Sequence, residues 1–287
     1  MTVKASDYDN EFPVTWCPGC GNFAILQALK QALAELDLRP DQVVLVSGIG
    51  QAGKLPHYMR CNFFNGLHGR AIPLATAVRI ANTGLPVIVV GGDGDLFGEG
   101  GNHFTHALRR NVNLTVLSHN NQVFGLTKGQ ASPTAEVGLS ARLQPRGVIL
   151  HPFNPLAAAV IGEAALVARG FAGESGHLVG LIKRAVRTDG FALVDVLQPC
   201  VSFDRKHTFQ WYRDRIYNLD ESGHDPRDFA AAIARSREWD QQVPIGVFFE
   251  NPDRPSYEQA TPVLRGEPLV DRKPDPGRVQ KLIDSFL

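Results

Sequence analysis

An aspartate flanked by glycines is the residue of this sequence whose setting points most directly to chemistry. Asp93 lies in Gly-Asp-Gly, at the end of a short apolar run. Glycine lets the backbone approach a phosphate closely, and a carboxylate offers Mg²⁺ a hard oxygen ligand. Asn121 and the backbone carbonyl of Val123 could supply two more oxygens. We therefore predict that these three residues hold a Mg²⁺ ion that bridges the two phosphates of a diphosphate.

Segments with helical and extended patterns alternate around these residues. Apolar residues recur at helical spacing over 22–36, with Asn22 as the expected N-cap, and a continuous apolar run predicts a strand over 87–90. Further strands are expected at 43–47, 114–118, 191–197 and 245–249, and further helices at 72–81, 102–109, 154–169, 177–187 and 227–237.

This alternation is typical of an α/β fold, a doubly wound and mainly parallel sheet with helices on both faces. Ligands of such sheets bind beyond the carboxyl ends of the strands. Because Asp93 and Asn121 follow consecutive strands, we expect both at one edge, and this context favours a diphosphate site over an ordinary tight turn. We expect one domain over 1–250 and an extended tail over 251–287, which is rich in proline and charge and lacks periodicity.

Composition excludes several classes of function. Lysine and arginine number 29, as do aspartate and glutamate, so no net charge attracts the chain to nucleic acid or to anionic lipid. Residues 1–12 lack the apolar core of a signal peptide, and no apolar run approaches the roughly 18 residues that span a bilayer. We therefore expect a soluble, cytoplasmic protein.

The four cysteines form a second candidate site. Cys17 and Cys20 form a Cys-x-x-Cys before the first expected helix, Cys61 falls in an expected loop, and Cys200 follows a strand. Zinc sites and iron–sulfur clusters both use such pairs. A thioredoxin-like redox pair is an alternative, although the expected strand does not precede it. Isolated buried cysteines more often serve only packing.

Together these motifs resemble a known family. The spacing from Gly-Asp-Gly to the Asn pair resembles the diphosphate-binding motif of thiamine-dependent enzymes. Over about residues 13–215 the chain resembles the β subunit of 2-oxoacid:ferredoxin oxidoreductases, in the class that pairs it with a larger α subunit. The matching runs are WCPGCG (16–21), VSGIG (46–50), LHGRA (67–71), GDGD (92–95), GGNHFTHALRRN (100–111), NNQVFGLTKGQ (120–130) and QPC (198–200).

The resemblance implies specific roles for these runs. Mg²⁺ would be held by Asp93, Asn121 and Val123, and a [4Fe–4S] cluster would be bound by cysteines near the cofactor. The residues implied to contact thiamine diphosphate (TPP) are Ile49, Gly50, Gln51, Ala52, His68, Gly94, Asp95, Gly125, Leu126, Thr127, Lys128, Gly129 and Gln130.

The cluster departs from the family pattern at one position. Cys17, Cys20 and Cys200 match, but relatives carry the remaining cysteine directly after Gly-Ile-Gly, where this chain has Gln51. Cys61 is the expected replacement. A cluster with three thiolates and a weaker fourth ligand, or a lost cluster, are the alternatives.

The implied reaction is the reversible, coenzyme A-dependent oxidative decarboxylation of a 2-oxoacid, with electrons passing through the cluster to ferredoxin. Thiamine enzymes activate the cofactor with a glutamate on a second domain, for which this chain has no room, so we expect an α subunit in an α2β2 assembly. Lys128 resembles the lysine of 2-oxoglutarate-type relatives and could pair with a distal carboxylate. A solvated surface lysine is the alternative.

Two other functions fit parts of the pattern. A non-oxidative thiamine decarboxylase or synthase half would need no cluster. A cluster-bearing electron-transfer subunit would have no chemistry of its own, but it would not need Asp93 and Asn121.

Overall fold

An eight-stranded sheet forms the centre of the computed structural model, which describes residues 2–141, 143–273 and 275–287. The strand order is β2-β1-β3-β4-β8-β7-β10-β9, and neighbours from β2 to β7 are parallel. The strands are β1 (Val44–Ser47), β2 (Asn62–Asn65), β3 (Val87–Gly92), β4 (Leu114–Asn120), β7 (Leu166–Phe171), β8 (Phe191–Leu197), β9 (Ile216–Asn218) and β10 (Val243–Glu250). A separate hairpin pairs β5 (Val123–Phe124) with β6 (Gln130–Ala131). The predicted doubly wound, mainly parallel fold is confirmed.

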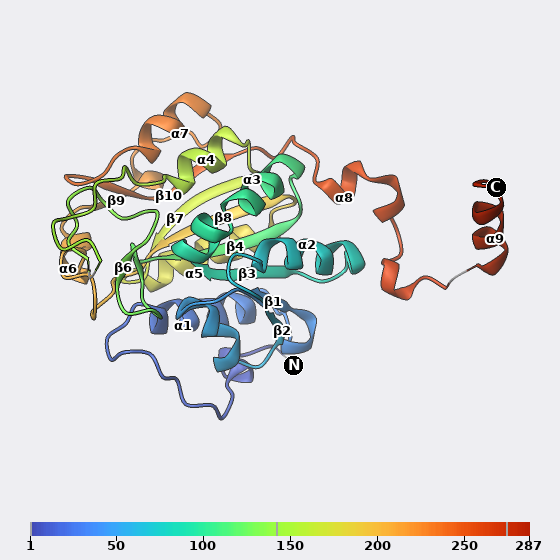
Figure 1. The fold of residues 1–287 in the computed structure, drawn as a ribbon, viewed down its shortest axis with the longest axis horizontal. Helices are drawn as coiled ribbons and strands as arrows, with labels where there is room; N and C mark the ends of the chain where they lie inside the picture. Colours follow the sequence, from blue (N-terminus) through green and yellow to red (C-terminus); the bar gives the residue numbers. More distant parts are fainter. Residues whose placement is uncertain (1, 142, 274) are drawn as a thin grey trace.

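Helices cover both faces of the sheet (Figure 1). Helices α1 (Asn22–Glu35) and α5 (Ser175–Arg187) contribute to one apolar core. Helices α2 (Ala71–Ala81), α3 (Gly101–Arg110), α4 (Pro155–Ile161) and α7 (Phe229–Ser236) contribute to a second core. The short helix α6 (Phe209–Arg213) packs near the β9 edge with a third, smaller group of apolar residues. Because both faces are covered, the central strands β3, β4, β7 and β8 are almost wholly buried.

The helix predicted over 154–169 is wrong in its second half. α4 ends at Ile161, Glu163 adopts a positive φ of 52°, and 166–171 form strand β7. The alanine-rich sequence favours a helix, but pairing with β8 and β10 completes the backbone hydrogen bonds of a buried strand. Tertiary context therefore decides this segment.

The predicted N-cap is also wrong. Asn22 is the first residue within α1, and Gly21 occupies the cap. The Asn22 side chain instead contacts the buried His119 at the end of β4, with Oδ1 2.7 Å from Nδ1. Burial lowers the pKa of His119 to about 3. A neutral histidine therefore joins α1 to the edge of the sheet where the site lies.

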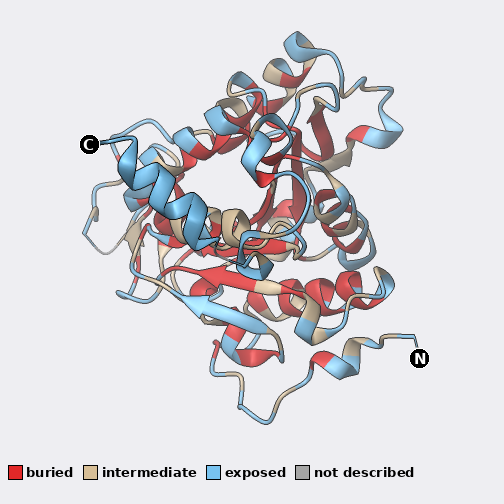
Figure 2. Cartoon of the chain, turned by 90° about the vertical axis from the view of Figure 1, so that its right-hand side faces the viewer, coloured by how far each residue is buried: buried red, intermediate tan, exposed pale blue. Residues whose placement is uncertain are grey.

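The predicted tail contains more regular structure than its composition indicated. α8 (Tyr257–Ala260) packs on the body, since Glu258 is buried and pairs with Arg79. α9 (Pro276–Asp284), capped by the side chain of Asp275, has no buried residue and stands away from the body. Figure 2 shows it exposed along its whole length.

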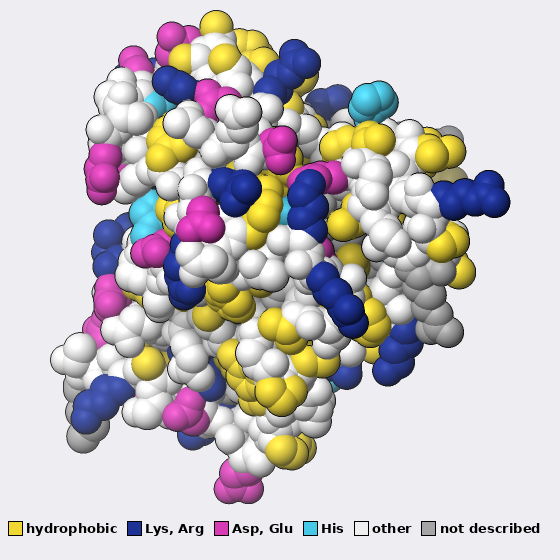
Figure 3. All heavy atoms as spheres, turned by 90° about the vertical axis from the view of Figure 1, so that its left-hand side faces the viewer, with side chains coloured by type: hydrophobic (Ala, Val, Ile, Leu, Met, Phe, Trp, Pro, Cys, Tyr) yellow, Lys and Arg dark blue, Asp and Glu magenta, His cyan; other side chains and the backbone are white. Residues whose placement is uncertain are grey.

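The distribution of charge on the surface can be compared with the zero net charge of the sequence. In the face drawn in Figure 3, acidic, basic and apolar side chains are interspersed. Within the described ranges, every helix is too short or too polar to cross a membrane.

Candidate active site

The ends of strands β1, β3 and β4 meet around a small cavity at the carboxyl edge of the sheet. Its walls come from the turn after β1, from the Gly-Asp-Gly turn and from the segment after β4. The lining residues are Ile49, Gly50, Gln51, Ala52, His68, Gly92, Asp93, Gly94, Asp95, Asn121, Val123, Phe124, Gly125, Leu126 and Thr127. The structure thus brings together residues that lie far apart in the sequence.

Asp93 presents one free carboxylate oxygen in this cavity. Its Oδ2 accepts hydrogen bonds from the hydroxyls of Ser132 and Thr134, each at 2.5 Å, and from the backbone N–H of Gln122 at 3.2 Å. Its Oδ1 is buried and has no hydrogen-bond partner among the described residues. Burial raises the pKa of Asp93 to about 6, against the lowering effect of the hydroxyls. An uncompensated buried carboxylate is a group that a metal cation would stabilise.

Asn121 and Val123 lie beside Asp93 in the same cavity. The Asn121 side-chain oxygen accepts a hydrogen bond from the Val123 N–H at 3.1 Å, which fixes the turn between them. A carboxylate, an amide oxygen and a backbone carbonyl are all hard oxygen donors, which is the donor set that Mg²⁺ favours. These residues therefore fit the predicted ion.

Asp95 organises the neighbouring loops. Its Oδ1 accepts hydrogen bonds from the backbone N–H of Ile49 at 3.1 Å and of Gly69 at 2.7 Å, and lies 2.6 Å from His68 Nδ1. A Cβ at Gly48 would lie 2.1 Å from its other oxygen, so only glycine fits there. Asp95 therefore joins the turn after β1 to the loop before α2 and holds His68 at the cavity wall.

The β5–β6 hairpin covers the Gly-Asp-Gly turn. A Cβ at Gly94 would lie 2.2 Å from the Phe124 ring, so glycine permits this close approach. The hairpin tip carries Lys128 with a φ of 81° and Gly129 with a φ of 99°. Lys128 is exposed and, like Gly129 and Gln130, is not among the lining residues of the cavity.

Sequence reasoning missed the two hydroxyls that orient Asp93. Ser132 and Thr134 are buried and follow the hairpin in the sequence. No motif in the sequence connects them with Asp93. The Thr134 hydroxyl oxygen also lies 2.9 Å from the Asn120 side-chain oxygen, so its one hydrogen is shared between Asp93 and Asn120. Only the return of the chain after β6 brings them under the carboxylate.

Three of the four cysteines lie on two joined loops. Cys17 and Cys20 close a turn by a backbone hydrogen bond of 3.0 Å, and the Gly21 N–H donates to the Pro199 carbonyl beside Cys200 at 3.4 Å. The Gln198 amide donates to the Cys20 sulfur, and the Ser202 hydroxyl donates to the Cys17 sulfur. Burial raises the pKa of Cys20 to about 11, and the nearby Cys200 and Cys17 thiols add to this.

Cys61 lies in a different place. It directly precedes β2, whose first residue, Asn62, pairs with Val44 at the start of β1, so it stands at the opposite edge of the sheet from Gln51. It packs against the core that contains Tyr8, and burial raises its pKa to about 12. Its predicted role as the fourth cluster ligand would require a substantial movement of this segment.

Gln51 occupies the wall between the cavity and the cysteine loop. Its backbone carbonyl accepts a hydrogen bond from Trp16 Nε1 at 2.8 Å, beside Cys17. Its side-chain oxygen is buried without a hydrogen-bond partner among the residues described.

Among the described residues, no three His, Cys, Asp or Glu side chains converge on one metal ion. Each thiolate of a [4Fe–4S] cluster binds a different iron, so cluster cysteines need not converge on one point. A cluster does require its cysteines to lie on neighbouring loops, as Cys17, Cys20 and Cys200 do.

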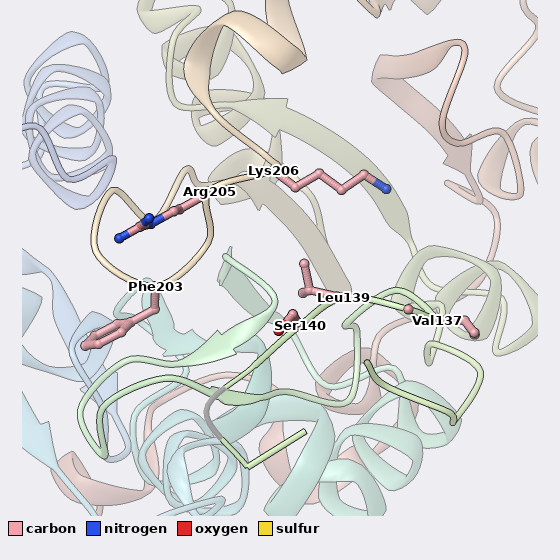
Figure 4. Close-up of a pocket in the computed structure, with 7 residues that line it drawn as sticks. Val137, Leu139, Ser140, Phe203, Arg205 and Lys206 are labelled. Carbon is pink, nitrogen blue, oxygen red and sulfur yellow. The ribbon is translucent and has the colours of Figure 1, made fainter. Parts of the chain in front are cut away.

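A larger hollow beside the hairpin does not belong to this site. It measures about 530 Å³ and lies between residues 137–140 and the loop that carries Phe203, Arg205 and Lys206 (Figure 4). The Phe203 ring would lie 2.7 Å from a Cβ at Gly129. This loop thus supports the hairpin tip from outside.

The fold and the carboxylate site define a thiamine diphosphate-binding domain of the thiamine enzyme class. A family model described as the C-terminal TPP-binding domain of thiamine pyrophosphate enzymes matches residues 43–196. A model of the C-terminal part of the pyruvate ferredoxin oxidoreductase β subunit matches residues 200–266.

Individual relatives narrow this class. The chain is 47% identical, over 85% of its length and 84% of the relative's, to the 2-oxoacid:ferredoxin oxidoreductase β subunit of Saccharolobus solfataricus. It is 44% identical, over 70% of its length and 54% of the relative's, to the 2-oxoglutarate oxidoreductase subunit KorB of Mycobacterium tuberculosis. A solved 2-oxoglutarate:ferredoxin oxidoreductase from Magnetococcus marinus, with 2-oxoglutarate, coenzyme A and succinyl-CoA bound, superimposes with a TM-score of 0.90 at 36% identity, covering 98% of this chain and 96% of that one. The chain belongs to the β subunits of the 2-oxoacid:ferredoxin oxidoreductases, in the 2-oxoglutarate-type, two-subunit class.

Proposed function

We propose that this β subunit, together with an α subunit, catalyses the reversible, coenzyme A-dependent oxidative decarboxylation of 2-oxoglutarate and passes the electrons to ferredoxin. The observation that carries this proposal is the buried Oδ1 of Asp93, which has no hydrogen-bond partner in the described part of the chain and shares a cavity with Asn121 and Val123. Asp93, Asn121 and the Val123 carbonyl would hold Mg²⁺, and the ion would hold the diphosphate of TPP.

The cofactors would supply the reactive centres. TPP supplies the carbon nucleophile for decarboxylation, and a [4Fe–4S] cluster accepts and passes on single electrons. The chain's own residues position them: Ser132 and Thr134 orient Asp93, and Asp95 fixes the loops that carry Ile49 and His68. His68 lies on the cavity wall with Nδ1 beside Asp95, and in its imidazolium form the other ring nitrogen would donate a hydrogen bond to a diphosphate oxygen.

The cluster would bind to Cys17, Cys20 and Cys200. Their joined loops and the sulfur-directed donors, Gln198 and Ser202, support this assignment. The fourth ligand stays open: Cys61 was predicted from sequence, but its place before β2 favours a cluster with three protein thiolates.

The need for an α subunit is supported by the size and rim of the cavity. It measures about 100 Å³, well below the roughly 300–1,000 Å³ of ordinary ligand pockets. Ile49 and Leu126 at its walls are 38% and 40% exposed. An apolar rim of this kind suits a covering chain that would complete the cofactor site in an α2β2 assembly.

Lys128 would select the substrate. It is exposed at the hairpin tip, next to the cavity residue Thr127, so its ammonium group is free to meet the distal carboxylate of 2-oxoglutarate when the partner closes the site.

Anaerobic co-purification with the α subunit tests the proposal. We expect about four irons per αβ unit, together with 2-oxoglutarate-dependent reduction of ferredoxin that requires TPP, Mg²⁺ and coenzyme A. The Asp93→Ala variant should lose turnover and TPP binding while it retains iron. An iron-free protein that releases CO₂ without reducing ferredoxin would instead identify the non-oxidative alternative.

A further inference from the structure

A third cavity lies beside the ends of β4 and β7 and has no role in the proposed reaction. It measures about 460 Å³, within the range of small-molecule sites. Residues from the end of β4, the start of α4, strand β7 and the end of α7 line it. They are Asn120, Gln122, Thr134, Glu136, His151, Pro152, Phe153, Asn154, Pro155, Arg169, Ser236, Arg237, Glu238 and Trp239.

Arg169 is an under-neutralised cation in the wall of this cavity. It lies on β7 and is only 5% exposed. Its guanidinium carbon lies 5.5 Å from the centres of both the Trp239 and the Phe248 rings. Nε and Nη1 have no hydrogen-bond partner among the described residues. The aromatic rings therefore hold the charged group in place but do not use its N–H donors.

The nearest carboxylate does not compensate Arg169 fully. Asp195 Oδ2 lies 3.7 Å from Nε, beyond hydrogen-bond distance. Both Asp195 oxygens instead accept hydrogen bonds from the Asn120 amide at 3.2 Å. Burial raises the pKa of Asp195 and lowers the pKa of Arg169, since each charge lies in a poorly solvated place.

The two acidic residues that line the cavity are already neutralised. Glu136 accepts hydrogen bonds from His207 Nε2 at 2.6 Å, from Trp239 and from Lys206. Although burial raises its pKa, these bonds together lower it to about 2. Glu238 pairs with Arg235 at 2.7 Å and accepts a hydrogen bond from Tyr217.

Arg237 adds a second positive charge to the cavity, since it is exposed and lines the same space. Both glutamates pair with cations outside the lining, and Arg169 has Asp195 at 3.7 Å, so the charge without an ion pair among the described residues is that of Arg237. An oxyanion beside Arg169 would supplement the incomplete compensation by Asp195 and reduce the cost of a buried, under-paired charge.

We propose that this cavity binds a small organic anion or phosphate through an oxyanion group, carboxylate or phosphate, paired with Arg169 and attracted by Arg237. The cavity is separate from the proposed TPP and cluster sites, but hydrogen bonds connect it to the TPP site: Asn120 joins Asp195 to Thr134, which bonds Asp93.

Titration calorimetry of the full chain with succinate and, separately, with inorganic phosphate tests the proposal and distinguishes the two sources of oxyanion. We expect one of them to bind in the absence of TPP and Mg²⁺. Arg169→Gln should weaken that binding about tenfold or more, since a charge-assisted hydrogen bond is lost. Arg237→Ala should weaken it several-fold. Arg278→Ala removes the same charge from the exposed helix α9 and should leave binding unchanged.

A crystallographic soak keeps the test valid if Arg169→Gln fails to fold. Selenate should give an anomalous peak beside Arg169 in the wild type, and a weaker peak in Arg237→Ala. The proposal is overturned if neither probe binds and selenate is absent from the cavity, which would then hold only water. It is equally overturned if binding is the same in wild type, Arg169→Gln and Arg237→Ala.

Discussion

Replacing Asp93 with asparagine removes a carboxylate whose burial costs free energy whenever no metal is bound. Its pKa is raised from 3.8 to about 6, mainly by burial. At about 1.4 kcal/mol per pKa unit, this shift amounts to about 3 kcal/mol of lost stability at neutral pH.

The sign of the pH dependence follows from the direction of the shift. Because the pKa is higher in the folded state, the folded chain binds more protons than the unfolded chain between about pH 4 and pH 6. The free energy of unfolding contributed by Asp93 therefore falls as pH rises through this window. About 1.4 kcal/mol of this loss of stability occurs between about pH 5 and pH 7.5, a range in which the two proteins can be compared under mild conditions.

Urea unfolding in the presence of a chelator measures this effect. We expect the stability of Asp93→Asn relative to wild type to rise by about 1.4 kcal/mol from about pH 5 to about pH 7.5. Asp271→Asn, which removes an exposed carboxylate from the tail, should show no such rise. Addition of Mg²⁺ and TPP should then stabilise the wild type but not Asp93→Asn.

Two results would refute this reasoning. If wild type and Asp93→Asn changed in parallel with pH, the carboxylate would not be under-compensated in the metal-free chain. If Mg²⁺ and TPP stabilised both proteins equally, Asp93 would not be a ligand of the ion.

The remaining predictions concern the cluster, the substrate and the diphosphate turn. Cys17→Ser should lower the iron content and the cluster's electron paramagnetic resonance signal, whereas Cys61→Ser should leave both unchanged; loss of iron in Cys61→Ser would restore Cys61 as the fourth ligand. Lys128→Ala should raise the KM for 2-oxoglutarate about tenfold with little change for pyruvate, and an unchanged ratio of kcat/KM for the two acids would show that Lys128 is only a surface lysine. Gly94→Ala should weaken TPP binding at least tenfold, because the new methyl group would lie 2.2 Å from the Phe124 ring. The matched control is Gly101→Ala, whose methyl group would meet nothing within 4 Å. Equal affinity for TPP in the two variants would contradict the argument.

The sequence by itself determined the class of fold and the centre of the site. The run 87–90 is continuously apolar and 114–118 is largely apolar, as a parallel sheet covered on both faces requires. Parallel strands end at one edge, so Asp93 and Asn121 had to meet there. The resemblance to the oxidoreductase β subunits implied that the Cys-x-x-Cys lies near the cofactor and that the turn after β1 contacts it.

Other features depend on packing that no local pattern encodes. The segment 154–169 is rich in alanine, which favours a helix, yet its last residues enter strand β7 because β8 and β10 offer them a buried place in the sheet. Ser132 and Thr134 reach Asp93 only because the β5–β6 hairpin turns the chain back. Cys61 shares its residue type with the other three cysteines, yet the register of β2 against β1 places it at the opposite edge. Arg169 likewise stands out as a candidate anion ligand only in the folded chain, where Trp239 and Phe248 pack against its guanidinium group. Residue types and spacing specify which groups can react, whereas the sheet register and the returning loops decide which of them meet.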